Sequence, residues 1–149
     1  MSSSVLILGA KGDISREIAQ KYALNGYNLI LSGRRIKELE DFAKELRLFN
    51  VSVELKELDI TEIHRFEDFI SSLKPFPTGI IVGTGFNPLN SEASENHDKL
   101  MEMINVNYIG PISFINSIKK IIKTGFIIGI SSVAGERGRQ KNYLYGSSK

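Results

Sequence analysis

Short apolar runs alternate along this sequence with longer segments in which apolar residues recur every three or four positions. Residues 5–8 form an unbroken apolar run, which is typical of a parallel strand that is buried on both faces. Ile14, Ile18 and Tyr22 follow at the spacing of an amphipathic helix. Gly26 marks the end of that helix. The alternation of strand and helix occurs five times, and it predicts strands at residues 5–8, 28–32, 51–55, 79–82 and 126–130.

This alternation predicts one α/β domain over residues 1–149. We expect a doubly wound parallel sheet (Rossmann-type) with helices on both faces and the strand order 3-2-1-4-5. Val51, Val53 and Leu55 alternate with polar residues, so the third strand is expected at the sheet edge. In such folds ligands bind at the carboxyl ends of the strands.

The longest helix is expected over residues 100–122, with Gly125 ending it. Gly110 and Pro111 interrupt its apolar pattern. Because proline has no N–H group, Pro111 cannot bond the carbonyl of Asn107 four positions earlier. That carbonyl is then free for another partner, and the alternative is an ordinary proline kink.

Composition and charge exclude several classes of protein. The 149 residues are 42% hydrophobic and 24% charged, as in an ordinary soluble domain with one core. A net charge of +2 is too small to favour nucleic acid. There is no cysteine, and His64 and His97 are too few and too scattered for a metal site. Residues 1–4 lead straight into the first strand and no apolar run is long enough to span a membrane, so we expect no signal peptide, no membrane contact and a cytoplasmic location.

The first predicted strand ends in a glycine-containing turn, residues 9–15, which opens the first helix. A strand, a glycine turn and a helix in this order point backbone N–H groups and the positive end of a helix at a pyrophosphate. The alternative is a plain tight turn. Asp13 could cap the helix, and Ser15 could donate a hydrogen bond to phosphate. The predicted cofactor-binding residues of the turn are Gly9, Lys11, Gly12, Asp13 and Ile14.

The residues after the second strand bear on which dinucleotide is bound. An acid at this position would hold the ribose hydroxyls, whereas a cation accommodates a 2′-phosphate. The sequence has Gly33, Arg34 and Arg35 here and no acid. Arg34, together with Lys11 in the glycine turn, therefore favours NADP over NAD. The alternative is that both cations are solvated surface charges.

The last part of the chain carries candidate catalytic side chains. Tyr145 and Lys149 are four positions apart, so on a helix they share a face and the ammonium can favour the tyrosinate. Ser132 follows the fifth strand, where its hydroxyl can hold a substrate oxygen against the phenol. The alternative is a helix with one aromatic side chain and one solvated lysine.

A serine thirteen positions before a tyrosine, a lysine four positions after it and a nucleotide-binding amino terminus together resemble the short-chain dehydrogenase/reductase family. The resemblance extends from Val5 to Lys149. It implies reversible reduction of a carbonyl by NADPH, in which Tyr145 protonates the oxygen and Ser132 orients it. Lys149 would lower the pKa of the tyrosine and bind the nicotinamide ribose. Asn107 matches a family asparagine whose backbone carbonyl holds a water of the proton relay.

The resemblance assigns two further segments. Asp59 and Ile60 resemble the family segment that contacts the adenine ring, although Asp59 or Thr61 could instead cap the following helix. Gly83 and Gly85 lie where the family usually has Asn-Asn-Ala-Gly, and Gly85 would let the backbone approach a ribose. Both family asparagines are missing, so we expect their hydrogen bonds to be absent or replaced.

The resemblance also implies what the chain lacks. The family continues beyond the lysine with two more strands and a substrate-covering segment, so we expect a carboxyl-terminal truncation, a small carbonyl or alcohol substrate, and a homo-oligomer in the full-length form. Two alternatives stay open: an NADP-binding regulator without turnover and an inactive fragment of a reductase. The regulator is supported by the missing asparagines and by Asp13 and Ser15, which replace two glycines of the family pattern Gly-x-x-x-Gly-x-Gly. The intact set of Ser132, Tyr145 and Lys149, which a regulator would not require, argues against it.

Overall fold

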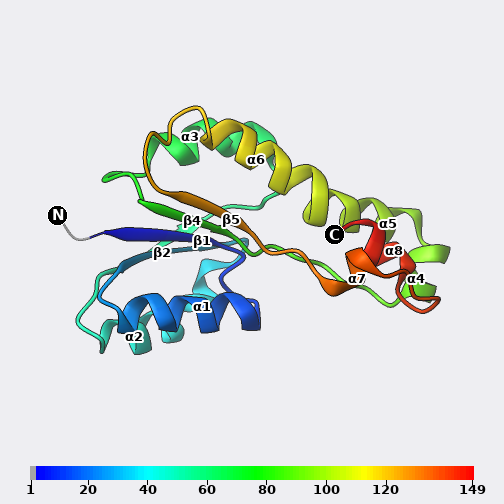
Figure 1. The fold of residues 1–149 in the computed structure, drawn as a ribbon, viewed down its shortest axis with the longest axis horizontal. Coiled ribbons are helices and arrows are strands. Elements are labelled where there is room, and N and C mark those ends of the chain that lie inside the picture. Colours follow the sequence, from blue (N-terminus) through cyan, green and yellow to red (C-terminus); the bar gives the residue numbers. More distant parts are fainter. Residues whose placement is uncertain (1–2) are drawn as a thin grey trace.

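A computed structural model describes residues 3–149 as a five-stranded sheet flanked by helices (Figure 1). Met1 and Ser2, which were expected to lead into the first strand, lie outside the described residues. All neighbouring strands are parallel, and their order is β3-β2-β1-β4-β5. The predicted fold class and strand order are therefore confirmed. The strands are β1 (Ser4–Leu8), β2 (Asn28–Gly33), β3 (Val53–Glu57), β4 (Gly79–Val82) and β5 (Phe126–Gly129).

Helices cover both faces of this sheet (Figure 1). One face carries α1 (Asp13–Leu24), η1 (Ile36–Leu39) and α2 (Glu40–Arg47). The other face carries η2 (Ile63–Arg65), α3 (Phe66–Ser71) and the α5–α6 rod, made of α5 (His97–Ile104), the π-helical turn η3 (Asn105–Ile109) and α6 (Gly110–Ile118). Three short helices lie at the carboxyl end of the sheet: α4 (Asn90–Glu95), α7 (Val133–Glu136) and α8 (Tyr143–Ser147). Among residues 3–149, no helix has both the length and the apolar character needed to cross a bilayer.

The core consists of two apolar layers, one on each side of the central strand β1. Val5 and Ile7 face the layer under α1 and α2, whereas Leu6 and Leu8 face the layer under α3 and α6. All four side chains are buried because β1 has a paired strand on each edge and helices above and below. This double burial explains the unbroken apolar run from which the strand was predicted.

The third strand begins two residues later than predicted, at Val53, which pairs with Leu29. The left-handed backbone at Asn50 (φ 60°) turns the chain after α2. Because of this turn, the strand that pairs with β2 begins only at Val53. Its expected position at the sheet edge is confirmed.

The long helix differs from its prediction at both ends. Instead of one helix over residues 100–122, the chain forms the α5–α6 rod, which ends at Ile118. The N–H of Gly110 bonds the carbonyl of Asn105, five positions back, because a wide π turn accommodates the missing N–H of Pro111. Gly125 does not end the helix. It has φ +122°, and a Cβ atom there would lie 2.1 Å from the carbonyl oxygen of Thr78, so this glycine lets the chain enter β5 beside β4.

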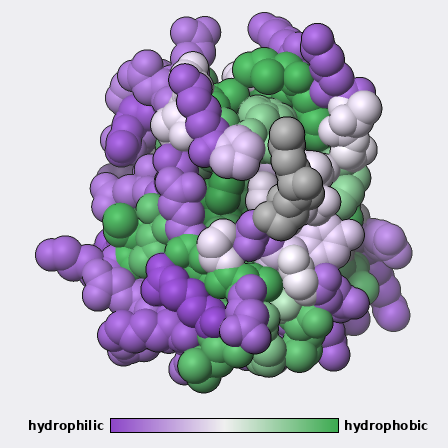
Figure 2. All heavy atoms as spheres, turned by 90° about the vertical axis from the view of Figure 1, so that its left-hand side faces the viewer, coloured by the Kyte–Doolittle hydropathy of each residue, from purple (hydrophilic) through white to green (hydrophobic). Residues whose placement is uncertain are grey.

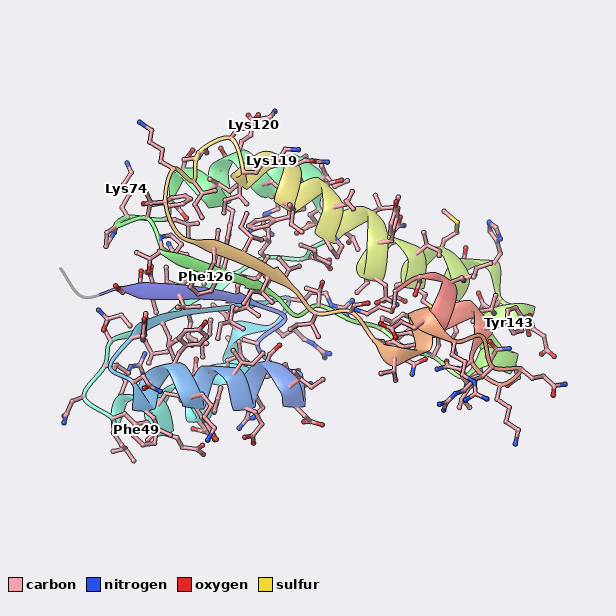
Figure 3. The ribbon with its side chains drawn as sticks, viewed as in Figure 1. Phe49, Lys74, Lys119, Lys120, Phe126 and Tyr143 are labelled. Atoms are coloured by element: carbon pink, nitrogen blue, oxygen red, sulfur yellow. The ribbon has the colours of Figure 1, made fainter. Side chains whose placement is uncertain are left out.

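The two ends of the sheet differ in character. At the amino ends of the strands, charged and polar side chains cover much of the surface, and apolar side chains lie between them and along one edge (Figure 2). Lys74, Lys119 and Lys120 lie toward this end, whereas Tyr143 lies at the opposite end with α7 and α8 (Figure 3). The carboxyl ends of the strands, where a doubly wound fold binds its ligands, therefore point toward the short helices.

Candidate functional site

A cavity of about 370 Å³ lies at the carboxyl ends of β1, β2 and β4. The structure brings eight of the predicted cofactor-binding residues together in its wall: Gly9, Lys11, Gly12, Arg34, Asp59, Ile60, Gly83 and Gly85. Asp13 and Ile14 begin α1 but do not line the cavity. Sequence analysis missed the other lining residues, which are Leu8, Gly33, Arg35, Glu38, Leu39, Leu58, Thr84 and Val106.

The glycine turn forms one wall of the cavity. Gly9 has φ +71°, and a Cβ atom there would lie 2.8 Å from the backbone nitrogen of Thr84, so only glycine allows the two loops to approach this closely. Gly12 caps α1 and donates its N–H to the carbonyl of Gly9 (3.1 Å). Asp13 is the first helical residue and no side-chain cap is formed, so the prediction that Asp13 caps the helix is wrong. The amino terminus of α1 borders the cavity at Gly12.

Ser15 and Gly83 pack against each other behind this wall. Ser15 is only 2% exposed, and a Cβ atom on Gly83 would lie 2.3 Å from its Oγ. Ser15 therefore fills the space beside Gly83, and it is not among the residues that line the cavity. The predicted hydrogen bond from Ser15 to phosphate stays a prediction.

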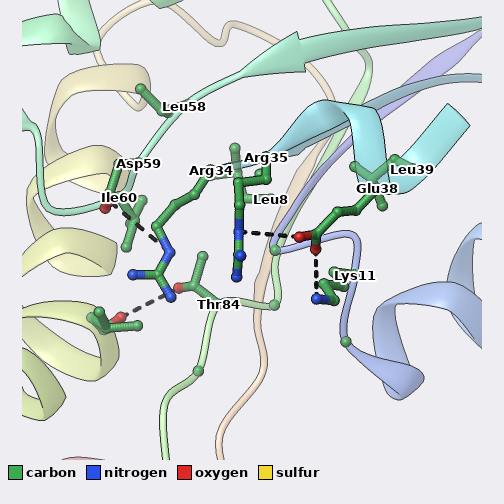
Figure 4. A pocket seen from close by; sticks show the side chains of 16 residues that line it. Leu8, Lys11, Arg34, Arg35, Glu38, Leu39, Leu58, Asp59, Ile60 and Thr84 are labelled. Carbon is green, nitrogen blue, oxygen red and sulfur yellow. Dashed lines mark hydrogen bonds and ion pairs between the residues drawn. The ribbon is translucent and has the colours of Figure 1, made fainter.

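Three cations at the cavity are paired with three carboxylates (Figure 4). Arg34 lies 3.3 Å from Glu102 and 4.0 Å from Asp59. Lys11 (2.5 Å) and Arg35 (3.2 Å) share the carboxylate of Glu38, which lies on η1.

Glu38 corrects the expectation that no acid follows the second strand. Glu38 is three positions after Arg35 in the sequence, and it lines the cavity with its carboxylate against Arg35. The hydrogen bond from Lys11 lowers the pKa of this carboxyl, and the charge of Arg35 acts in the same direction, so Glu38 is anionic at neutral pH. The sequence does show an acid three positions after Arg35. It indicates a cavity residue only once the helical turn η1, which brings Glu38 back to the cavity, is known.

Asp59 closes a turn after β3. Its Oδ1 accepts from the backbone N–H (2.9 Å) and the hydroxyl (2.8 Å) of Thr61. Because the next helical turn begins at Ile63 with Glu62 before it, neither Asp59 nor Thr61 caps that helix. The predicted adenine contact of Asp59 and Ile60 stays a prediction.

The buried side chain of Asn107 connects two distant segments. Its Oδ1 accepts from the N–H of Phe86 (2.7 Å), and its Nδ2 donates to the carbonyl of Phe86 and to the hydroxyl of Ser148 (both 2.8 Å). The hydroxyl of Thr84 donates to the carbonyl of Val106 (3.4 Å). These bonds hold the loop after β4 against the α5–α6 rod, and so supply bracing where the two family asparagines are missing. The predicted role of the Asn107 carbonyl in holding a water stays a prediction.

The candidate catalytic side chains lie beyond β5 and do not line the cavity. Ser132 caps α7, where its Oγ accepts from the N–H of Ala134 (3.2 Å). Tyr145 lies on α8, partly buried. Lys149 follows that helix and donates from Nζ to the carbonyl of Ile130 (2.8 Å).

Tyr145 and Lys149 were expected to face each other on one helix. Within residues 3–149, however, no hydrogen bond joins the side chains of Ser132, Tyr145 and Lys149. The physical reason is that α8 ends at Ser147, so Lys149 lies past its last turn. Burial lowers the pKa of the Lys149 ammonium, which favours the release of its proton.

Sequence comparisons relate this chain to one protein family and to proteins that are named oxidoreductases or reductases. A family model described as short chain dehydrogenase matches residues 3–149. An uncharacterized oxidoreductase of Mycobacterium tuberculosis is 27% identical over 158 aligned residues, which cover 99% of this chain and 62% of that protein. A sulfoacetaldehyde reductase of Chromohalobacter salexigens is 29% identical over 157 aligned residues, which cover 100% of this chain and 62% of that protein. The chain thus spans less than two thirds of the length of these relatives.

Solved structures share the fold over nearly the whole chain. Serine dehydrogenase from Escherichia coli superposes with a TM-score of 0.85 at 22% identity, covering 97% of this chain and 68% of that one. An actinorhodin polyketide ketoreductase crystallised with NADPH superposes with a TM-score of 0.85 at 20% identity, covering 99% of this chain and 61% of that one.

Proposed function

This chain belongs to the short-chain dehydrogenase family, and on that premise we propose that it is the nucleotide-binding part of an NADP-dependent oxidoreductase that interconverts a small carbonyl compound and an alcohol. The observation that carries the proposal is the cavity in which the glycine turn faces the loop after β4. The wall of this cavity contains Lys11 and Arg34, and it also contains the backbone groups of the glycine turn, which could bind a pyrophosphate.

The residues of the cavity fit the adenosine half of a dinucleotide. Its volume of about 370 Å³ lies within the range of about 300–1,000 Å³ that is usual for small-molecule sites. A Cβ atom on Gly12 would make only ordinary contacts, the nearest at 3.6 Å, so the turn leaves room beside it. Leu8 and Val106 supply apolar wall for a purine ring.

Each group of the wall has a proposed part in holding the cofactor. Gly9, Gly12 and the amino terminus of α1 would hold the pyrophosphate, because backbone N–H groups and the positive end of the helix face it. Arg34 and Lys11 would hold the 2′-phosphate. Asp59 and Ile60 would contact the adenine, and Gly83 and Gly85 would allow the approach of the ribose.

When bound, the nicotinamide supplies or accepts the hydride. We propose that Tyr145 donates the proton to the carbonyl oxygen while Ser132 orients that oxygen by a hydrogen bond. Lys149 would keep the phenol acidic and hold the nicotinamide ribose. Asn107 would hold a water that passes the proton on.

Binding measurements test this proposal directly. NADPH and NADH are titrated at low salt into the wild-type chain and into Arg34→Ala. We expect NADPH to bind roughly tenfold more tightly, because a charged hydrogen bond to phosphate is worth about 1.5–3 kcal/mol. Arg34→Ala should remove most of this preference, while Arg137→Ala, in the exposed loop before α8, should leave it unchanged. Equal affinities for the two cofactors would contradict NADP dependence.

A regulator that binds NADP without turnover is the second candidate. It is supported by the missing hydrogen bonds among Ser132, Tyr145 and Lys149. A full-length protein that binds NADPH but reduces no carbonyl in a broad substrate panel would favour the regulator. Measurable reduction by the full-length protein would exclude it.

We also propose that the full-length protein is a homo-oligomer. The α5–α6 rod exposes several large apolar side chains, which favours a second protein surface over water. Sedimentation of the full-length protein tests this, and a monomer at micromolar concentration would contradict it. The exposed apolar side chains are Met101, Tyr108, Ile109 and Ile112.

A further inference from the structure

Glu38 links two cations that come from different walls of the cavity. Its carboxylate contacts Lys11 of the glycine turn and Arg35 at the end of β2. The side chain of Glu38 is 34% exposed, against 66% for Lys11 and 70% for Arg35. The carboxylate is therefore the most covered member of the trio, and both cations reach inward to it.

We propose that Glu38 is a specificity-determining residue, a counter-ion that occupies the cations which a 2′-phosphate would otherwise engage and so limits the preference for NADP over NAD. This inference rests on the proposed function, because it assumes that the adenosine end of a dinucleotide occupies the cavity.

The charge balance of the cavity supports this role. Arg34 pairs with Asp59 and Glu102 at 4.0 and 3.3 Å, whereas Lys11 and Arg35 pair with Glu38 at 2.5 and 3.2 Å, so Glu38 controls how far these two cations can add to the phosphate contact of Arg34. A phosphate that approaches them meets the negative charge of Glu38 at contact distance, and like charges repel. The hydroxyl of NAD at the same place can instead donate a hydrogen bond to a carboxylate. Glu38 therefore acts in opposite directions on the two cofactors.

The backbone keeps this carboxylate in place. Glu38 lies on η1, where its N–H donates to the carbonyl of Arg35 (3.1 Å). The next residue, Leu39, is buried in the core and anchors the turn. Because the turn is anchored, the backbone of Glu38 stays at the cavity wall, and its carboxylate stays within side-chain reach of Lys11 and Arg35.

The test compares two nucleotides that differ only at the 2′ position. Adenosine 2′,5′-bisphosphate and adenosine 5′-monophosphate are titrated into the wild-type chain, E38Q and E38K, by calorimetry or NMR shifts. E38Q should raise the ratio of their affinities, in favour of the bisphosphate, by roughly two- to fivefold, as expected for partly exposed charges. E38K should raise it further. The matched control is E45Q, which removes the same charge from the exposed side of α2 and should leave the ratio unchanged.

The outcomes separate this inference from the proposed function. If both nucleotides bind and E38Q leaves the ratio unchanged or lowers it, Glu38 is not a competing counter-ion, although the dinucleotide site stands. If neither nucleotide binds to any of the proteins, the proposed function fails and this inference fails with it. If E45Q raises the ratio of the two affinities as much as E38Q does, the change follows from the net charge of the protein and not from the position of Glu38. That result would also overturn the inference.

Discussion

The Oγ of Ser15 occupies the space that a side chain on Gly83 would need, since a Cβ atom there would lie 2.3 Å from it. Ser15 is 2% exposed, so this contact lies inside the molecule. The next nearest atom to such a Cβ is the carbonyl oxygen of Leu8, at 3.2 Å. Ser15 of α1 and Gly83 of the loop after β4 therefore fit together only because Gly83 has no side chain.

A double-mutant cycle tests this match. Gly83→Ala should lower the free energy of unfolding by about 1–3 kcal/mol, because an added methyl group overpacks the site. Adding Ser15→Ala removes the clashing Oγ and should restore most of that loss. Urea unfolding of the two single variants and the double variant measures the coupling. Strictly additive losses would show that the two residues are independent.

Asn107 offers a second test of stability. Asn107→Ala removes the side-chain partner of the N–H and carbonyl of Phe86, while the hydroxyl of Ser148 keeps only its bond to the carbonyl of Tyr145. A buried polar group without a partner costs about 1–3 kcal/mol, so the free energy of unfolding should fall by at least this amount. Asn116→Ala, on the exposed side of α6, is the control and should change it by no more than about 0.5 kcal/mol. Equal losses in the two variants would contradict the bracing role of Asn107.

The strands and the glycine turn could be predicted because their signals are local. A strand buried on both faces needs consecutive apolar residues, as at residues 5–8, and a backbone contact such as that of Gly9 with Thr84 needs a glycine. Topology rules for alternating strands and helices then restrict the strand order.

The parts that could not be predicted depend on where helices end. The spacing of Tyr145 and Lys149 implies a shared face only if the helix continues past Lys149, and α8 ends at Ser147. In the same way, Gly125 was expected to end a helix, although its conformation serves the contact with Thr78. Helix ends are set by tertiary contacts that a single sequence does not display.

Contacts between distant residues are the other part that sequence reasoning missed. Glu38 enters the cavity because η1 turns back toward Lys11, which lies 27 residues earlier. Asn107 reaches Ser148 across 41 residues. Neither pair follows a periodic pattern, so only the fold brings them together.

Lys149 provides a prediction about pH. Burial lowers the pKa of its ammonium, so the folded protein releases this proton at a lower pH than the unfolded chain, where lysine titrates near 10.4. Between the two pKa values the unfolded state binds more protons, and stability therefore rises with pH in that window. The cost of burying the charge is present below the folded pKa and is relieved above it.

NMR titration of the lysine ¹³Cε resonances measures this shift. The resonance that disappears in Lys149→Arg should titrate below the ordinary value for lysine. Because burial is the cause, opening the carboxyl-terminal region with low urea should bring the value back toward normal. A midpoint at or above the ordinary value would contradict the burial of this ammonium.

The proposed proton donor is tested by removing one oxygen atom in the full-length protein. Tyr145→Phe deletes the hydroxyl that would protonate the carbonyl oxygen, so turnover should fall by about 10²–10⁴-fold, the usual contribution of general acid catalysis. NADPH affinity should stay nearly unchanged, because Tyr145 does not line the cavity proposed for the adenosine half.

Tyr143→Phe is the matched control for Tyr145→Phe. It removes the same hydroxyl two residues earlier on α8, from a side chain that is half exposed, and should keep turnover near the wild-type rate. Steady-state reduction and direct NADPH titration must be measured on the same preparations, because a loss of both would indicate misfolding of α8. Turnover retained in Tyr145→Phe, with cofactor still bound, would show that another group supplies the proton.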